Sequence, residues 1–366
     1  RSDSDLYTFG YRFKPWVGTP IASAQEILKY MGEVIADDKL DEHIRYGHAI
    51  KSAKWSSADN VWRVEAVKKA TGETVIFTTN FLWMCQGYYR HSEGYTPEWE
   101  GMSDYKGKII HPQTWPEDLD YKGKKVLVVG VGTSAHDVAQ DLHGHGAHVK
   151  MIQRGSATIA SVKAAGLVHS VYYEEDLPLE DCDMIAAASS YPLLVKSYQA
   201  AVEKMKQVDA DLLAGLAARG FKLDFGDDNT GHQMKFRRKH GGYYLNCGCS
   251  ELIVEGEIGL IQHEDTAHFV EDGMLMKDGS VEKADLVVLA TGYQSQEAVV
   301  REMLGDKIAD RVGQIWGIAA NGEIANMFVS TPQPGLWFTG GGFAHCRIYS
   351  HFIAMGIKVR EMGLVT

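Results

Sequence analysis

One stretch of the chain has the residue types and spacing needed to bind a phosphate group. The apolar run V-L-V-V is followed by G-V-G-T-S-A, in which Gly130, Gly132 and Ala135 form the pattern G-x-G-x-x-A at the start of an amphipathic helix. Glycines let a backbone approach a pyrophosphate, and a helix N-terminus offers unpaired N–H groups and a positive dipole end. Glycines that merely allow tight strand–helix packing would be the alternative. We predict that a dinucleotide is bound here, by Gly130, Val131, Gly132, Thr133, Ser134 and Ala135.

The segment after this helix indicates which dinucleotide is bound. H-V-K-M-I-Q-R at 148–154 has the composition of a second strand and completes the βαβ unit of a Rossmann domain. It ends in Arg154, where an enzyme that uses NAD would usually have an acidic residue for the ribose hydroxyl. A guanidinium suits a 2′-phosphate, so the residue favours NADPH. A solvated surface arginine is the alternative.

The elements that position this unit can be read from periodicity and breakers. A helix is predicted at 23–36 with Ser23 as N-cap, and a pair of helices is predicted within 181–219. A polar loop up to about Asp104 is a plausible crossing between domains. A closing helix is predicted from about Ser350. Strands are predicted at 48–55, 61–66, 73–78, 81–87, 258–262, 268–276, 285–293 and 336–342.

Composition limits the classes of partner. The 366 residues are 45% hydrophobic and 23% charged, which is typical of a globular protein. The length suffices for two cores or one large interrupted core, and two domains are the default expectation. The formal net charge of −11 and the lack of a Lys/Arg run argue against nucleic acid or an anionic membrane as a partner and favour small molecules. Five scattered cysteines support neither a disulfide framework nor a metal site and favour the cytoplasm. We find no apolar run near the roughly 18 residues of a membrane-spanning helix.

A second motif lies directly before the dinucleotide turn. In Y-K-G-K-I-I-H-P-Q-T-W-P, the positions of Tyr105, Gly107, His111, Trp115 and Pro116 closely resemble the F-x-G-x-x-x-H-x-x-x-W-P fingerprint of Baeyer–Villiger monooxygenases, which are FAD- and NADPH-dependent flavoproteins. Tyrosine replaces the phenylalanine of that fingerprint. The resemblance implies that this segment links two domains and that the histidine couples domain motion to chemistry. Without its neighbours, this histidine would be interpreted as a packed or surface residue.

The resemblance extends over essentially the whole chain and implies further site residues. Asp3 matches a position near the isoalloxazine ring and the nicotinamide, although a turn or helix-cap aspartate is the alternative. Ile50 matches a position whose backbone contacts the adenine of FAD. Thr291 and Gly292, in A-T-G-Y, match the return to the flavin domain and are expected to bind cofactor. The catalytic residues that the resemblance implies are Asp3, His111 and Trp115.

The implied fold is an α/β flavoprotein with two dinucleotide-binding domains, in which an NADPH-binding Rossmann domain is inserted into an FAD domain. The expected boundaries are 1–120 and 289–366 for the FAD domain and 121–288 for the NADPH domain, which carries a helical insertion at about 180–220. In this family a first strand and G-x-G-x-x-G turn for FAD would precede Arg1, so the FAD domain is expected to be incomplete. The chain as given is therefore expected to bind NADPH weakly or not at all, to carry little FAD and to show no NADPH-dependent oxygenation.

The implied reaction is insertion of one oxygen atom from O₂ into a small organic substrate through a C4a-peroxyflavin, as Baeyer–Villiger oxidation of a ketone or as N- or S-oxidation. Arg237 and Arg238 are candidates for the arginine that stabilises the flavin peroxide in typical members, and a solvated basic loop is the alternative. Two other functions remain open, a flavin- or NADPH-dependent reductase without oxygenation and an inactive chain that binds NADPH at most. A homodimer also remains open.

Overall fold

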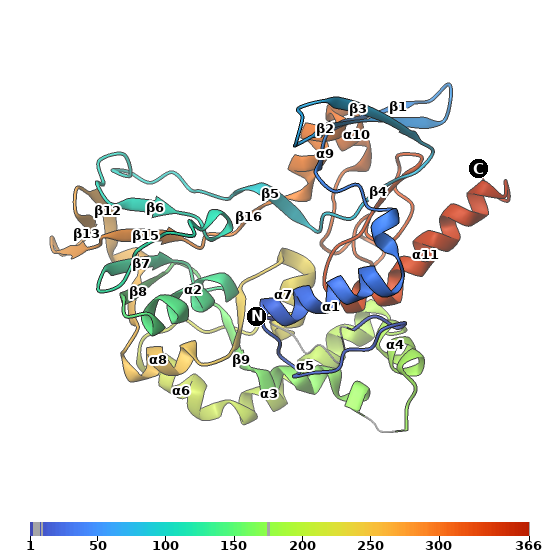
Figure 1. Ribbon diagram of the computed structural model, residues 1–366. Coiled ribbons are helices and arrows are strands. Elements are labelled where there is room, and N and C mark those ends of the chain that lie inside the picture. Colours follow the sequence, from blue (N-terminus) through green and yellow to red (C-terminus); the bar gives the residue numbers. More distant parts are fainter. Residues whose placement is uncertain (3–7, 9, 174–175, 366) are drawn as a thin grey trace. The chain divides into compact units, whose positions relative to one another are not determined.

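The computed structural model describes residues 1–2, 8, 10–173 and 176–365, so Asp3 lies outside the described residues (Figure 1). Contacts divide the chain into two units, each of which is described by itself. Unit 1 comprises Arg1–Arg90, Val171–Ala188 and Ser295–Thr366. Unit 2 comprises His91–Ser170 and Ser189–Gln294. The chain therefore passes between the units at four points. The expected domain boundaries after residues 120 and 288 stay a prediction.

Unit 2 is built on a parallel sheet of five strands in the order β11-β8-β7-β15-β6. The strands β7 and β15 lie at its centre, where each pairs with a neighbour on both sides. In chain order the strands are β6 (Lys108–Ile110), β7 (Lys125–Val129), β8 (His148–Gln153), β11 (Gly259–Gln262) and β15 (Leu286–Leu289).

Both faces of this sheet are buried, which explains why its central strands are uninterrupted apolar runs. Side chains alternate along a strand. Val126 and Val128 of β7 therefore pack in one cluster with Ala135 and Ala139 of the following helix, α2 (Thr133–Gly144). Leu127 and Val129 pack on the other side, in a cluster that contains Phe269 and Met274 of an antiparallel meander. The meander strands are β12 (Thr266–Val270), β13 (Gly273–Met276) and β14 (Val281–Lys283).

The remaining elements of unit 2 surround this sheet. A separate parallel pair is formed by β9 (Thr158–Ser161) and β10 (Tyr243–Asn246). The helices are α3 (Val162–Ala165), α5 (Tyr191–Val208), α6 (Ala210–Ala218), α7 (Gly231–Lys239) and α8 (Cys249–Glu255), with short 3₁₀ turns at Pro112–Thr114 and His263–Asp265. Three further elements include residues on both sides of the boundary between the units: the paired strands β5 (Tyr89–Gly94) and β16 (Tyr293–Ser295), and a 3₁₀ turn at Gly166–Tyr173.

Unit 1 combines two small sheets with helices. The first helix, α1, starts at a capping box in which Ser23 and Glu26 exchange hydrogen bonds, so the predicted N-cap is confirmed. The indole of Trp62 donates to the carbonyl oxygen of Gly335 at 2.9 Å and ties the two sheets together. The antiparallel sheet is β1 (His48–Ser56), β2 (Val61–Lys68) and β3 (Thr74–Thr79), and the parallel pair is β4 (Leu82–Met84) and β17 (Leu336–Phe338). The helices are α1 (Ala24–Asp37), α4 (Leu179–Ala187), α9 (Gln296–Leu304), α10 (Asp306–Val312) and α11 (Phe343–Glu361), with a 3₁₀ turn at Leu40–Glu42.

Several sequence predictions of element type or boundary are wrong. The predicted strands 285–293 and 336–342 end earlier, at Leu289 and Phe338. The region 181–219 forms parts of three helices rather than a pair, because Asp209 both ends α5 and precedes α6. The region 268–276 forms two strands, because the chain reverses before Gly273. The last helix starts at Phe343 rather than near Ser350, since Gly342 is already its N-cap. No helix formed by the described residues combines the length and apolar character that spanning a membrane requires.

Candidate nucleotide-binding site

The turn between β7 and α2 has a backbone that only glycine suits at its first position. Gly130 has a φ of +123°, and a Cβ atom there would collide with the backbone carbonyl oxygen of Ala290. Its N–H donates to the carbonyl oxygen of Ile152 at 3.0 Å, which ties the turn to the end of β8. The predicted glycine turn is therefore held against both neighbouring strands of the sheet.

The first turn of α2 faces this glycine turn without a capping side chain. Gly132 is the N-cap and forms no side-chain cap hydrogen bond. Val131 and Ala135 are buried and anchor the turn in the core. The Thr133 hydroxyl donates to the carbonyl oxygen of Tyr243 at 3.1 Å, so it serves the fold. An uncapped helix N-terminus next to glycines is an anion-binding arrangement.

Arg154 lies at the same edge of the sheet as this turn. Strands β7 and β8 are parallel neighbours in which Val129 pairs with Ile152, so their carboxyl ends meet there. The preceding Gln153 is fully buried and exchanges two 2.9 Å hydrogen bonds with the backbone of Lys222. Arg154 itself is exposed, and the structure shows no hydrogen bond or ion pair from it to any described residue. An exposed guanidinium beside an anion-binding turn can bind a phosphate.

His111 joins the two segments that lead into and out of unit 2. The N–H of Gln113 donates to His111 Nδ1 at 3.1 Å, so in the neutral ring the proton is on Nε2. Nε2 then donates to the carbonyl oxygen of Gly292 at 2.9 Å. The Thr291 hydroxyl donates to the carbonyl oxygen of Tyr95 at 2.5 Å, and the Tyr95 N–H donates to Gly292 at 3.0 Å. The structure thus brings His111, Thr291 and Gly292 together.

Trp115 lies four residues from His111 but has a different environment. Its ring packs partly buried against the core cluster on the α2 face of the sheet, and it meets the ring of Tyr121 edge-on at 6.1 Å. These contacts anchor the fingerprint segment to the sheet. Ile50 belongs to unit 1, where it is exposed on β1 beside a register shift between positions 50 and 52. It is therefore not among the residues assembled in unit 2.

A buried histidine that the sequence analysis did not single out lies in α2, four residues after the N-cap Gly132. His136 is 0% exposed, and its ring stacks on Tyr244 with 4.1 Å between centroids. Its Nδ1 donates to the carbonyl oxygen of Gly132 at 3.1 Å, so the buried Nε2, which has no partner among the described residues, carries the lone pair. Protonation of that atom would bury a charge, and burial therefore lowers the pKa of His136 to about 4.

Two further histidines have lowered pKa values, His232 in α7 and His169 in the 3₁₀ turn at Gly166–Tyr173. The pKa of buried His232 is lowered to about 3 by burial and by nearby His169. The pKa of His169 is lowered to about 4 by burial and by the charge of Arg237. The amide nitrogen of Gln233 lies 3.2 Å from Nε2 of His232 and 3.4 Å from Nε2 of His169.

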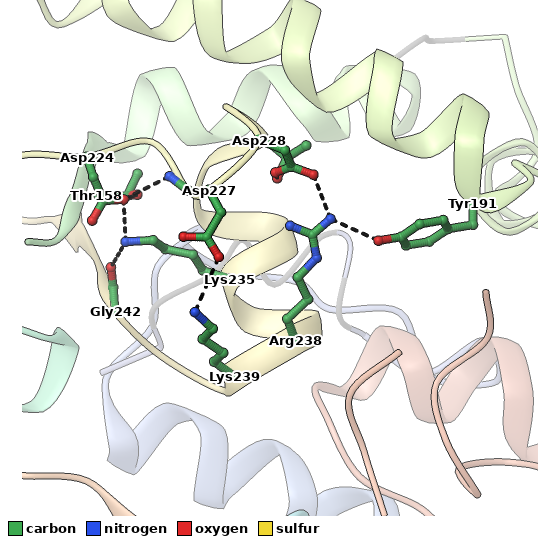
Figure 2. Close-up of polar contacts among 11 residues, drawn as sticks. Thr158, Tyr191, Asp224, Asp227, Asp228, Lys235, Arg238, Lys239 and Gly242 are labelled. Atoms are coloured by element: carbon green, nitrogen blue, oxygen red, sulfur yellow. Dashed lines mark hydrogen bonds and ion pairs between the residues drawn. The ribbon is translucent and has the colours of Figure 1, made fainter. Parts of the chain in front are cut away.

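The structure gives the two candidate arginines of α7 different environments, and Figure 2 shows that of Arg238. Arg238 forms an ion pair of 2.6 Å with Asp228 and donates to the Tyr191 hydroxyl at 2.9 Å. This pairing lowers the pKa of Asp228 to about 2. Lys235, also on α7, forms an ion pair with Asp224. Arg238 therefore cross-links α7 to α5, whereas Arg237 forms no hydrogen bond or ion pair with a described residue.

Unit 1 contains a second strand–glycine–helix sequence. β17 is followed by Gly340, Gly341 and Gly342, and α11 starts without a side-chain cap. Because β4 and β17 are parallel, their carboxyl ends also meet at this edge. This helix N-terminus is where unit 1 could hold a phosphate-bearing cofactor such as FAD. Within the part of the chain that the structure describes, no cluster of His, Cys, Asp and Glu could hold a metal ion.

A parallel α/β sheet with a glycine turn and an uncapped helix N-terminus at its carboxyl edge is the arrangement of the dinucleotide-binding fold. Residues 21–313 match the family of flavin-binding monooxygenase-like proteins. The chain belongs to this family, and the resemblance seen in the sequence is thereby confirmed.

Individual relatives and solved structures that resemble this chain are also flavoprotein monooxygenases. The chain is 34% identical over 306 residues to the FAD-containing monooxygenase EthA of Mycolicibacterium smegmatis, an alignment covering 81% of this chain and 60% of that protein. Cyclohexanone monooxygenase of Rhodococcus sp. Phi1 bound to NADP⁺ has the same fold, with a TM-score of 0.67 at 16% identity over 98% of this chain and 75% of that one. An oxidised steroid monooxygenase bound to NADP gives 0.65 at 17% identity over 99% and 77%. The predicted class of fold, that of the two-dinucleotide-binding-domain flavoproteins, is confirmed.

Proposed function

We propose that the chain functions as an FAD- and NADPH-dependent monooxygenase that inserts one oxygen atom from O₂ into a small organic substrate. The substrate would be a ketone in a Baeyer–Villiger oxidation, or a nitrogen or sulfur compound. One observation carries the choice of NADPH: exposed Arg154 lies at the same sheet edge as the uncapped N-terminus of α2. Family membership supports the flavin, because its relatives are FAD-containing monooxygenases.

In this proposal the chain binds and orients the cofactors and the substrate and excludes water from them, while the oxygen chemistry belongs to the cofactor. Bound FAD would supply reduction by NADPH followed by reaction with O₂. The α2 N-terminus and Arg154 would hold the phosphates of NADPH. His111, with its tautomer set by the Gln113 N–H, would keep the Gly292 segment in place. The wider set of proposed site residues remains Asp3, Ile50, Gly130, Val131, Gly132, Thr133, Ser134, Ala135, Arg154, Thr291 and Gly292 for cofactor binding, and Asp3, His111 and Trp115 for catalysis.

Calorimetric titration of the 366-residue chain with NADP⁺ and with NAD⁺ tests the nucleotide assignment. A charge-assisted hydrogen bond to phosphate contributes roughly 1.5 to 3 kcal/mol, so Arg154→Ala should weaken NADP⁺ binding about ten- to hundredfold and leave NAD⁺ binding unchanged. Lys163→Ala, which removes another exposed basic side chain of unit 2, should change neither affinity. Equal losses for NADP⁺ and NAD⁺ in Arg154→Ala would contradict the assignment.

Oxygenation is tested separately by supplying FAD, NADPH and isotopically labelled O₂ with ketones, amines and sulfides. Label in the organic product supports a monooxygenase and distinguishes ketone from heteroatom oxidation. NADPH consumption that yields only hydrogen peroxide or a reduced acceptor would instead support a reductase without oxygenation. The chain spans 60% of the length of its EthA relative, so a parallel measurement on a longer chain is the appropriate comparison.

A further inference from the structure

A tyrosine outside the glycine turn contacts the first turn of α2. The hydroxyl of Tyr293 lies 3.1 Å from Oγ of Ser134, which is the second residue of that helix. Ser134 is therefore at the predicted phosphate site, whereas Tyr293 lies in the segment that follows β15. The two residues are 159 positions apart in the chain, and this hydrogen bond connects them directly.

The same tyrosine is linked through His111 to the segments at the start and the end of unit 2. Its ring meets the His111 ring edge-on, with 5.8 Å between centroids and 76° between planes. His111 in turn holds the carbonyl oxygen of Gly292, next to Tyr293 in the chain, and that oxygen also accepts from the N–H of Tyr95. Unit 2 starts at His91 and this part of it ends at Gln294. A continuous series of contacts therefore runs from the α2 N-terminus to both connections.

We propose that Tyr293 is a positioning residue that couples occupation of the dinucleotide turn to the segments at which the chain enters and leaves unit 2. This inference rests on the proposed binding of NADPH. A phosphate at the α2 N-terminus can only accept, so the Ser134 hydroxyl donates its one proton to it. The Ser134 oxygen then accepts from Tyr293, which must become the donor. The phosphate thus fixes the direction of the hydrogen bond and restrains the Tyr293 ring against His111.

The fold of unit 2 does not depend on this hydroxyl. Tyr293 is 38% exposed, and the neighbouring core contacts are made by the buried residues of β15. Tyr293→Phe keeps the ring beside His111 and removes the hydroxyl that bonds Ser134. Coupling between two sites is reciprocal, so loss of the bond should change both nucleotide affinity and the order of the connecting segments.

The test compares wild type with Tyr293→Phe, and with Tyr121→Phe as a matched control. The Tyr121 hydroxyl also bonds α2, through Asp141 at 3.4 Å, but away from the turn. NADP⁺ affinity is measured by calorimetry, and amide hydrogen exchange of residues 92–96 and 290–294 is measured with and without saturating NADP⁺. In wild type, NADP⁺ should slow exchange in both segments.

A neutral hydrogen bond corresponds to about a two- to tenfold change in affinity, and Tyr293→Phe should weaken NADP⁺ binding by that factor. At saturation the variant should lose protection in both segments while residues 130–136 stay protected, and Tyr121→Phe should behave as wild type. A wild-type chain that binds NADP⁺, with the same affinity and segment protection in Tyr293→Phe, overturns the coupling alone. A wild-type chain that does not bind NADP⁺ overturns the proposed function, and the coupling with it.

Discussion

Unit 2 should lose stability in mild acid because it buries neutral histidines. The pKa of His136 falls from 6.5 to about 4 on folding, and that of His232 falls from 6.5 to about 3. Between the folded and unfolded values, the unfolded chain binds the proton and the folded chain does not. The free energy of unfolding therefore falls as pH falls below about 6.5, and each histidine stops contributing to that slope below its folded pKa.

The magnitude follows from the width of the pH window. One pKa unit corresponds to about 1.36 kcal/mol, so at pH 5 each of these two histidines lowers the free energy of unfolding by about 2 kcal/mol relative to pH 7. Together they lower it by about 4 kcal/mol. Asp228 contributes little in this window, since pairing with Arg238 lowers the pKa of its carboxyl group to about 2.

Urea unfolding followed by circular dichroism at pH 7 and pH 5 measures this difference. His136→Phe keeps an aromatic ring against Tyr244 and cannot be protonated, so its loss between the two pH values should be about 2 kcal/mol smaller than in wild type. His148→Gln removes an exposed histidine at the start of β8 and should keep the wild-type loss. If His136→Phe showed the full wild-type loss, the assignment of a buried neutral imidazole would be wrong.

Three ion pairs give further predictions. Asp183→Asn should lower the free energy of unfolding by about 3 to 5 kcal/mol, because it leaves Arg347, whose side chain is 2% exposed, as an uncompensated buried charge. Asp306→Asn, in the exposed pair with Arg301, should lower it by only about 0 to 1 kcal/mol. Urea titration of the two variants measures the difference. Arg238→Met should lower the melting temperature without changing NADP⁺ affinity, because that guanidinium cross-links α5 and α7; an affinity change at constant melting temperature would refute this structural role.

The sequence predicted the strand–turn–helix at 126–142 well because its signals are local. An apolar run, two glycines and a helical period lie within one short window, and both faces of the resulting strand are buried. Glycine is required at position 130 because of the carbonyl oxygen of Ala290, which is distant in the chain. The glycine itself is nevertheless visible in the sequence. Arg154 could be proposed from the sequence for the same reason, since it directly follows the second strand.

The contacts that complete the candidate site could not be predicted because they join residues far apart in the chain. Tyr293 was visible as part of A-T-G-Y, but nothing local indicates a hydrogen bond to Ser134. The environment of His111 depends on Gly94, where a Cβ atom would overlap the imidazole ring. The difference between Arg237 and Arg238 depends on which side of α7 faces the carboxylate of Asp228. Such pairings depend on tertiary structure, whereas hydrophobic periodicity in the sequence predicts only local elements.

The helical insertion is held by different partners on its two sides. Before Ala188, Asp183 accepts two hydrogen bonds from the Arg347 guanidinium, at 2.8 and 2.6 Å, within unit 1. After Ser189, Tyr191 accepts from Arg238 within unit 2. The short stretch between α4 and α5 is therefore a connection between the units rather than part of one helical pair. Residues 188–190 therefore join two helices that are each held by a buried or half-buried guanidinium group, α4 by Arg347 within unit 1 and α5 by Arg238 within unit 2.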